Sequence, residues 1–283
     1  MDTSASRVQR EGDARSKPSR DRDGLRRLSG WEIQWRVVDA LVYRELRTRV
    51  SDVKGGFLGV LMQPRGLIMI CRVFLSLINR GRGGSLNPFL FLASGVVLFT
   101  VFSQIANRSI TAMEANEALL FYKPVKPIDT IIARTFCETG LYSSCLIVIC
   151  VGTWIVIDQV VMANLGLFFF TILLASFIGF STGLMFMVAG HLMPSFKQGG
   201  LWIPRILWFL SGVPYRYWDF PPWTRPFFVW NPLLHTIELN RQSMSNDYFT
   251  PDANLGYAVI SSLILLALAL WIYYNNERKL LTL

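Results

Sequence analysis

Three arginines lie inside apolar stretches of the sequence: Arg65, Arg72 and Arg205. A charge at the centre of a bilayer costs at least about 2.5–3.5 kcal/mol on insertion scales, and no carboxylate lies in the predicted spans to neutralise it. A water-filled path carrying anionic groups, such as phosphates or carboxylates, would supply the missing negative charge, with each guanidinium as a bidentate partner. The alternative is that the side chains reach back to the membrane surface, which suits Arg65 and Arg205 better than the deeper Arg72.

The residue combinations that support catalysis or nucleotide binding are missing. No lysine follows a glycine, so the GxxxxGK[ST] nucleotide-binding loop cannot occur. The two histidines, His191 and His235, form no HExxH pair, and the four cysteines show no CxxC spacing. No acidic residue stands in the middle of a predicted span, which argues against a proton-coupled transporter. We therefore expect no catalytic residue, no metal site and no cofactor in this chain.

The elements that must position the arginines are hydrophobic helices. The chain has 283 residues, of which 52% are hydrophobic and only 17% charged, and a helix that crosses a bilayer needs about 20 mostly apolar residues. The stretch Leu255–Tyr274 carries no charge at all. The composition predicts an all-α, polytopic membrane protein whose permease domain covers residues 57–275. Its six spans are expected at roughly 57–78, 87–107, 139–157, 163–190, 200–215 and 254–275.

The region before the first span is basic and holds 13 of the 28 lysines and arginines within residues 1–56. Residues 1–30 have no apolar periodicity, which predicts a disordered arm. Residues 31–56 are expected to form an interface helix, because Trp31, Trp35 and Val38 begin one apolar face while arginines lie on the other. We expect anionic lipid headgroups, and not nucleic acid, to be the partner of this charge.

Orientation follows from the distribution of lysine and arginine. With both termini in the cytosol, the inner side holds 20 of these residues and the outer side five, Arg241 among them. The sequence therefore predicts cytosolic termini, including a cytosolic tail at residues 276–283.

An aromatic and proline-rich segment occupies residues 216–252, before the last span. Prolines this dense prevent one continuous helix, and two re-entrant half-helices are expected instead. The aromatic residues have two interpretations: they guide a glycan along the substrate pathway, or they form an aromatic belt at the membrane surface. The aromatic candidates for the pathway are Tyr215, Tyr217, Trp218, Trp223 and Trp230.

The loop between the second and third spans is predicted to contain one short helix, Thr111–Tyr122, which Pro124 stops. A short helix of mixed polarity, with a face of small residues, suits the docking of a partner; the alternative is an ordinary interfacial loop. The candidate docking residues are Ala112, Met113, Glu114, Ala115, Asn116, Glu117, Leu119, Leu120, Tyr122 and Lys123.

These parts, in this order, resemble the transmembrane subunit of type-2 ABC exporters, and in particular the capsular polysaccharide permease of KpsM type. The resemblance covers about residues 31–280. It rests on five pieces of sequence: Leu41–Arg49, Leu58–Pro64, Met113–Pro127 with its Tyr-Lys-Pro end, Phe209–Val213, and the motif before the last span. That motif, taken as the re-entrant signature, contains Asn231, Pro232, His235, Glu238 and Arg241.

The resemblance implies an inner-membrane homodimer that exports a lipid-linked polysaccharide. Two copies of an ABC ATPase subunit of KpsT type would bind ATP and magnesium and dock on residues 110–126, and a periplasmic co-polymerase or adaptor of KpsE type would lie beyond. Rival substrates within the family are O-antigen, teichoic acid or a small molecule. A membrane-embedded lipid or glycan enzyme is a second alternative, disfavoured because no carboxylate pair or histidine cluster is evident. A membrane scaffold is a third, and it leaves the docking loop unexplained.

Overall fold

The computed structural model describes residues 30–51, 86–120, 125–157, 162–248 and 250–281. Several predictions fall outside these ranges: the disordered arm, the first span with Arg65 and Arg72, and the docking residues Tyr122 and Lys123. Within the described ranges the regular structure is entirely helical. The all-α prediction is confirmed for this part of the chain.

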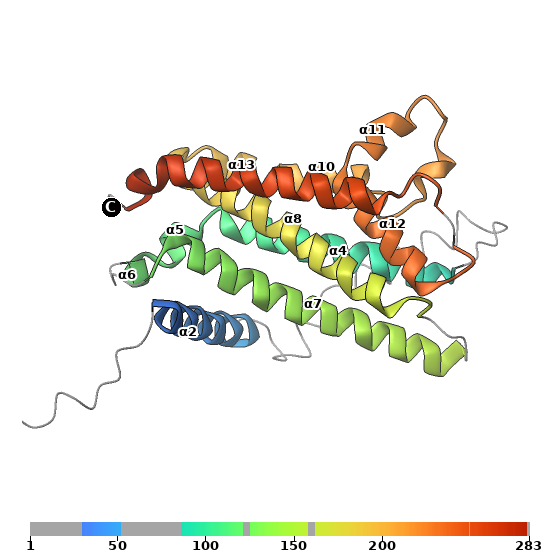
Figure 1. Cartoon of the computed structure of the whole chain (residues 1–283), viewed down its shortest axis with the longest axis horizontal. Coiled ribbons are helices and arrows are strands. Elements are labelled where there is room, and N and C mark those ends of the chain that lie inside the picture. Colours follow the sequence, from blue (N-terminus) through green and yellow to red (C-terminus); the bar gives the residue numbers. More distant parts are fainter. Residues whose placement is uncertain (1–29, 52–85, 121–124, 158–161, 249, 282–283) are drawn as a thin grey trace, which may run out of the picture.

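Five long helices form the body of the molecule and lie roughly side by side (Figure 1). They are α2 (Gly30–Ser51), α4 (Pro88–Ser109), α7 (Pro127–Ile157), α8 (Leu165–Leu192) and α13 (Leu255–Leu281). Shorter helices connect them: α5 (Ala112–Ala115), α6 (Glu117–Leu120), α9 (Phe196–Gly199), α10 (Trp202–Leu210), the 3-10 helix η1 (Tyr217–Asp219), α11 (Arg225–Val229) and α12 (Pro232–Met244).

Four of the described helices, α4, α7, α8 and α13, are long and apolar enough to cross a membrane. Asparagine side chains fix several helix starts: Asn87 accepts a hydrogen bond from the backbone N–H of Phe89, and Asn164 accepts one from that of Leu167. Pro88 follows the first of these caps at a position where its missing N–H does no harm. The second, fourth and last predicted spans therefore agree with the structure to within a few residues, apart from the longer C-terminal end of α13.

The central helix is α4, and α13 lies at the periphery. In α4, 78% of the apolar window is buried against the rest of the chain, whereas in α13 the figure is 17%. The exposed side of α13 carries large apolar side chains such as Ile260, Ile264 and Trp271. An apolar surface of this extent is compatible with contact with lipid or with another protein, and not with water.

The helices differ from three of the predicted ranges. The third span was expected from residue 139, but α7 begins at Pro127, because its early charged residues are paired inside the protein and do not end the helix. The fifth span was expected at 200–215, but α10 has only 9 residues and is too short to cross a bilayer alone. Residues 276–281 of the predicted tail continue α13 as helix.

The helix α12 connects the spans at the end of the bundle opposite to α5 and α6 (Figure 1). Its Arg241 was counted as an outer-loop charge, yet it is fully buried. The guanidinium forms an ion pair with Glu238 (2.7 Å), and Tyr248 donates to the other oxygen of that carboxylate (2.8 Å). The signature predicted as a re-entrant element thus contains a buried ion pair.

Arg241 also reaches three backbone carbonyls from other parts of the chain. It donates to Phe91 on α4 (3.2 Å) and to Gly212 (3.0 Å) and Val213 (2.8 Å) after α10, and it stacks on the Phe91 ring, 3.6 Å from the centroid. Four hydrogen bonds and a ring against its face therefore surround the guanidinium, which offsets much of the cost of burying an arginine.

Two glycines make this close packing possible. A Cβ on Gly95 of α4 would lie 2.6 Å from the Arg241 Nη2 atom and 3.1 Å from the Val213 carbonyl, so only glycine allows the guanidinium to approach α4. Gly212 has a φ of +63°, which L side chains rarely adopt, and it ends the turn that presents its carbonyl to Arg241.

We predict that Arg241→Met destabilises the protein by about 3 kcal/mol or more, because it leaves the Glu238 carboxylate buried without its cation. Thermal unfolding of the detergent-solubilised chain, followed by fluorescence-detected gel filtration, measures the change. Arg205→Met, at an exposed arginine, is the matched control. Equal melting temperatures for the two variants would contradict the assignment of Arg241 as a packing hub.

Candidate functional site

The predicted docking loop forms the two short helices α5 and α6, at one end of the bundle (Figure 1). Ala112 and Met113 are buried in an apolar cluster that includes Met187 of α8 and Tyr273 of α13. The first turn of the loop is therefore anchored to spans that are distant in the sequence. A force on the loop would reach these spans directly.

The opposite side of the loop is exposed. Glu114, Ala115, Glu117 and Ala118 face away from the bundle, and Glu114 pairs with Lys197 of α9. The small-residue face predicted from Ala112, Ala115 and Ala118 is thus divided, since Ala112 is buried and the other two are exposed. The exposed side of the loop therefore presents two carboxylates and two small side chains, while the buried Ala112 and Met113 fix its inner side.

The single helix predicted over Thr111–Tyr122 is interrupted at Asn116, so this prediction was wrong in detail. The Asn116 side chain is buried, donates to the Ala112 carbonyl (2.7 Å) and accepts a hydrogen bond from Arg44 of α2. Asparagine readily exchanges helical hydrogen bonds for such local ones. A contact with a helix about 70 residues earlier thereby fixes the bend between α5 and α6.

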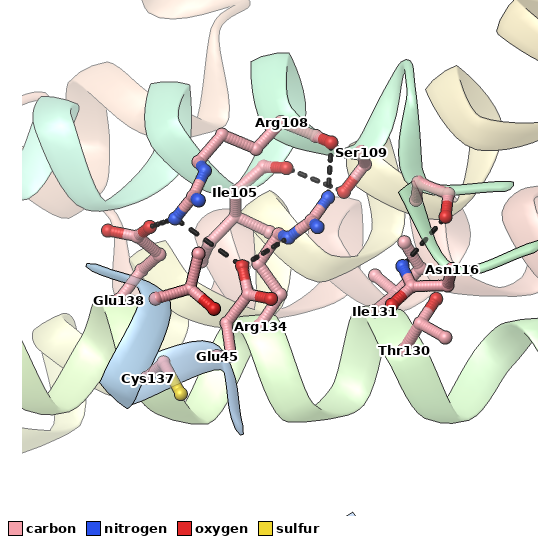
Figure 2. A network of polar contacts seen from close by, with 12 residues as sticks. Glu45, Ile105, Arg108, Ser109, Asn116, Thr130, Ile131, Arg134, Cys137 and Glu138 are labelled. Atoms are coloured by element: carbon pink, nitrogen blue, oxygen red, sulfur yellow. Dashed lines mark hydrogen bonds and ion pairs between the residues drawn. The ribbon is translucent and has the colours of Figure 1, made fainter. Parts of the chain in front are cut away.

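Four charged side chains from three helices meet beside this loop (Figure 2). Arg108 of α4 contacts Glu138 of α7 (2.7 Å) and Glu45 of α2 (3.4 Å). Arg134 of α7 donates from Nε to the same Glu45 oxygen (3.1 Å) and from Nη1 to the Arg108 carbonyl. We call these four residues the charge cluster.

The charge cluster is deeply placed. The Glu138 side chain is fully buried, and those of Arg134 and Glu45 are 5% and 11% exposed. Two arginines and two carboxylates balance, so that no uncompensated charge from this set remains in an apolar surrounding. Removal of one member would leave an excess charge among the other three.

The expectation that the spans contain no carboxylate was also wrong. Glu138 lies 11 residues after the first residue of α7, which corresponds to about 16 Å along the helix. The prediction placed the span one residue after it. The i, i+4 spacing of Arg134 and Glu138 was a local signal for a charged helix face, but nothing in the sequence indicated that Glu45 would complete it.

The interface helix α2 lies along α7 and is joined to it by specific contacts. Val38 and Leu41 are buried, Gln34 donates to the Asp129 carboxylate, and the Cys137 thiol donates to the Val42 carbonyl (3.4 Å). In contrast, Trp31 and Trp35 are 75% and 59% exposed. One part of the apolar side predicted for α2 is therefore buried against the protein, and the part with the two tryptophans is exposed.

The aromatic candidates lie in and around η1 and α11, and α11 lies at the end of the bundle opposite to α5 and α6 (Figure 1). They separate into two groups by the exposure of their side chains. Tyr217 is buried, Tyr215 packs edge-on against Phe220 and Phe228, and Arg225 lies 4.3 Å from the Trp218 ring centroid. These three candidates support the local structure. Trp223 and Trp230 instead are 74% and 81% exposed, and they are the two candidates of the five whose side chains are mostly exposed.

The remaining candidates also have defined places. Arg205 is exposed on α10 and lies over the Trp202 ring, 4.7 Å from its centroid. His235 is buried: its Nε2 donates to the Val229 carbonyl (2.6 Å) and its Nδ1 accepts the Asn254 N–H (3.2 Å). Both ring nitrogens are used, so this histidine connects α12 to the start of α13. Asn231 caps α12, with Pro232 at its first position.

Metal ligation has no candidate in the described part of the chain, where no three histidine, cysteine or acidic side chains converge. The described cysteines, Cys137, Cys145 and Cys150, are free and buried.

Comparison with known proteins identifies the family of this chain. A model of the ABC-2 type transporter family matches residues 36–245. The polysialic acid transport protein KpsM of Escherichia coli is 32% identical over 255 residues, which cover 90% of this chain and 98% of that protein. The chain belongs to the ABC-2 type transporter family.

Two further relatives are named for capsule polysaccharide export. The capsule polysaccharide export inner-membrane protein BexB of Haemophilus influenzae is 26% identical over 255 residues, covering 87% of this chain and 93% of the relative. The corresponding protein CtrC of Neisseria meningitidis is 27% identical over 241 residues, covering 84% and 90%. The resemblance drawn from the sequence motifs is confirmed.

We predict that Glu45→Gln in this ABC-2 chain lowers stability by about 3 kcal/mol, because two arginines then share the single carboxylate of Glu138. The double variant Glu45→Gln/Arg134→Gln restores the balance and should lose less than the sum of the two single variants. Thermal unfolding in detergent checks both, with Asp39→Asn, at an exposed position of α2, as the control. Additive losses would show that the charge cluster is not a unit.

Proposed function

We propose that this chain is the membrane subunit of an ATP-driven exporter that moves a lipid-linked, acidic capsular polysaccharide outward across the inner membrane. The observation that carries the proposal is the similarity over 98% of the length of KpsM, a protein named for polysialic acid transport. Relatives named for capsule polysaccharide export in two other bacteria support the same substrate class. O-antigen, teichoic acid or a small molecule is the alternative within the family.

In this proposal the energy comes from a separate ABC ATPase of KpsT type, docked on α5 and α6. Support comes from the geometry of the loop: its inner side is fixed between α7, α8 and α13, while its outer side presents Glu114, Ala115, Glu117 and Ala118. A partner that pushed on this surface would move the ends of three spans. ATP and magnesium would be bound by the ATPase and not by this chain.

The termini are proposed to be cytosolic and the spans to number six. The end of the bundle with α5 and α6 would then face the cytosol, together with the C-terminal end of α13, and α11 would face the periplasm (Figure 1). The exposed Trp223 and Trp230 flank α11 in the sequence and would lie on the same side. The positive-inside distribution supports this orientation. The fifth span would consist of α9, α10 and the turn that follows α10. The helices α11 and α12 would fold back as re-entrant pieces, and α13 would be the sixth span.

A homodimer is proposed, with the pathway at its interface. The helix α10 exposes Trp202, Ile206 and Phe209 at 59–60% each, beside the exposed Arg205. An apolar face with one cation suits contact with a second copy or with an acidic, lipid-linked substrate better than contact with water. Trp223 and Trp230 would lie where the glycan leaves, towards an adaptor of KpsE type, and anionic lipids would surround the basic arm.

The first test is co-purification with the ATPase. We expect the wild-type chain to retain an ABC ATPase subunit from its own cells, and Ala118→Arg to retain roughly tenfold less, because it places a bulky charge on the docking surface. The measurement is the mass ratio of the two subunits after affinity purification, with Asn246→Arg, exposed at the far end, as the control. Absence of any ATPase from the wild-type preparation would refute the proposed function.

The second test concerns the pathway arginine in the first span. We predict that Arg72→Ala abolishes surface capsule while ATPase retention stays normal, because the variant removes a substrate contact and not the docking surface. Capsule is quantified on the cell surface in a strain that carries only the variant, and Arg72→Lys separates the bidentate contact from charge alone. Normal capsule in Arg72→Ala cells would remove this residue from the pathway.

A further inference from the structure

A buried histidine connects three elements at the end of the bundle opposite to α5 and α6. His235 of α12 is 2% exposed. Its Nε2 donates to the Val229 carbonyl at the end of α11 (2.6 Å), and its Nδ1 accepts the backbone N–H of Asn254, the residue before α13 (3.2 Å). These two partners require a neutral ring with its proton on Nε2. We call Val229, His235 and Asn254 the histidine junction.

The histidine junction holds the segment around α11 against the start of α13. Tyr257, in the first turn of α13, packs on the His235 ring with the centroids 4.8 Å apart. The Tyr257 hydroxyl donates to the carbonyl of Trp230 (2.8 Å), the residue that follows α11. A change in the position of the His235 ring would therefore disturb both of these contacts between the α11 segment and α13.

The histidine junction accommodates only the neutral form of the ring. A protonated imidazole has two N–H donors and no acceptor, so its Nδ1 would face the Asn254 N–H as donor against donor. The pocket around the ring leaves no space for a water molecule that could accept from it. A buried donor without an acceptor is costly. Protonation of His235 therefore requires the Asn254 segment to move away from the ring.

The titratable groups that face the ring come from several of the elements around it. Among the described residues they are Tyr217 of η1, Glu238 of α12, Asp252 of the loop before α13, and Tyr257 of α13. Burial raises the pKa of Tyr217, so this phenol stays neutral. Glu238 already forms an ion pair with Arg241. Asp252 is exposed, and its carboxylate is the one that a loop movement can bring to a protonated Nδ1.

The direction of the pH dependence follows from the burial of the ring. Burial lowers the pKa of His235 below its usual value, and it outweighs the carboxylates of Asp252 and Glu238, which favour the charged ring. Because the folded-state pKa is the lower one, the junction is at full strength above the usual histidine pKa of about 6.5. It weakens as the pH falls below that value.

We propose that the histidine junction is a pH-sensitive switch that controls how firmly the segment with Trp223 and Trp230 is attached to α13. With a neutral ring, Asn254 is bonded to His235 and α11 is held. In mildly acidic medium the Nδ1–H turns to the Asp252 carboxylate, and α11 separates from the start of α13. An effect on export rests on the proposed orientation, in which this segment meets the external pH, whereas the switch itself depends only on these contacts.

Hydrogen–deuterium exchange of the purified full chain, read by mass spectrometry, tests the switch. The matched variant is His235→Asn, whose amide oxygen can accept the Asn254 N–H but whose side chain does not titrate. The two chains are compared at the same pH, so that the intrinsic pH dependence of exchange cancels. We expect equal exchange of residues 225–231 and 252–257 at about pH 8, and roughly fivefold faster exchange in the wild type at about pH 5.5. Equal exchange of the two chains at both pH values would overturn the proposal.

A second variant decides the question by itself if His235→Asn does not fold. Asp252→Asn, at an exposed position, leaves the neutral junction in place and removes the carboxylate that favours the charged ring. The pH at which residues 225–231 begin to exchange faster should fall by about 0.5 unit or more. Asp247→Asn, at an exposed carboxylate outside the pocket, is the control. An unchanged transition in Asp252→Asn would contradict the switch and leave the proposed function intact.

Discussion

A charge inside an apolar helix bundle must have partners there, and this requirement fixes the two ends of the molecule. At one end Arg241 satisfies its guanidinium with one carboxylate, three carbonyls and one ring. At the other, Arg108 and Arg134 share Glu45 and Glu138. Apolar packing tolerates small shifts between helices, whereas these fork-shaped contacts do not.

The two arginine sites join different sets of helices. The site around Arg241 lies among short helices, and it ties α12 to α4 and to the turn after α10, so it supports the lobe with the exposed Trp223 and Trp230. The charge cluster joins only long helices, α2, α4 and α7, next to the docking loop (Figures 1 and 2). A displacement of α2 or of α5 therefore reaches α4 and α7 through polar contacts with little freedom to adjust.

Sequence patterns were sufficient where a helix contacts mostly apolar surroundings. The spans α4, α8 and α13 follow from hydropathy alone. The patterns failed where a distant residue decides: α7 begins 12 residues earlier than expected because Arg134 and Glu138 find partners on α2 and α4, and the bend at Asn116 depends on Arg44. The motif containing Glu238 and Arg241 was visible in the sequence, but its role in packing depends on the close approach of Gly95, which no local pattern reveals.

The proposed orientation places the docking loop in the cytosol, and the segment that contains the exposed Trp223 and Trp230 on the opposite side of the membrane. Single cysteines at Ala115 and at Trp223, introduced into a chain whose native cysteines are replaced by serine, test it directly in spheroplasts with a membrane-impermeant maleimide. The account predicts labelling of Trp223→Cys in intact spheroplasts, and of Ala115→Cys only after the membrane is permeabilised. Labelling of Ala115→Cys in intact spheroplasts would contradict it.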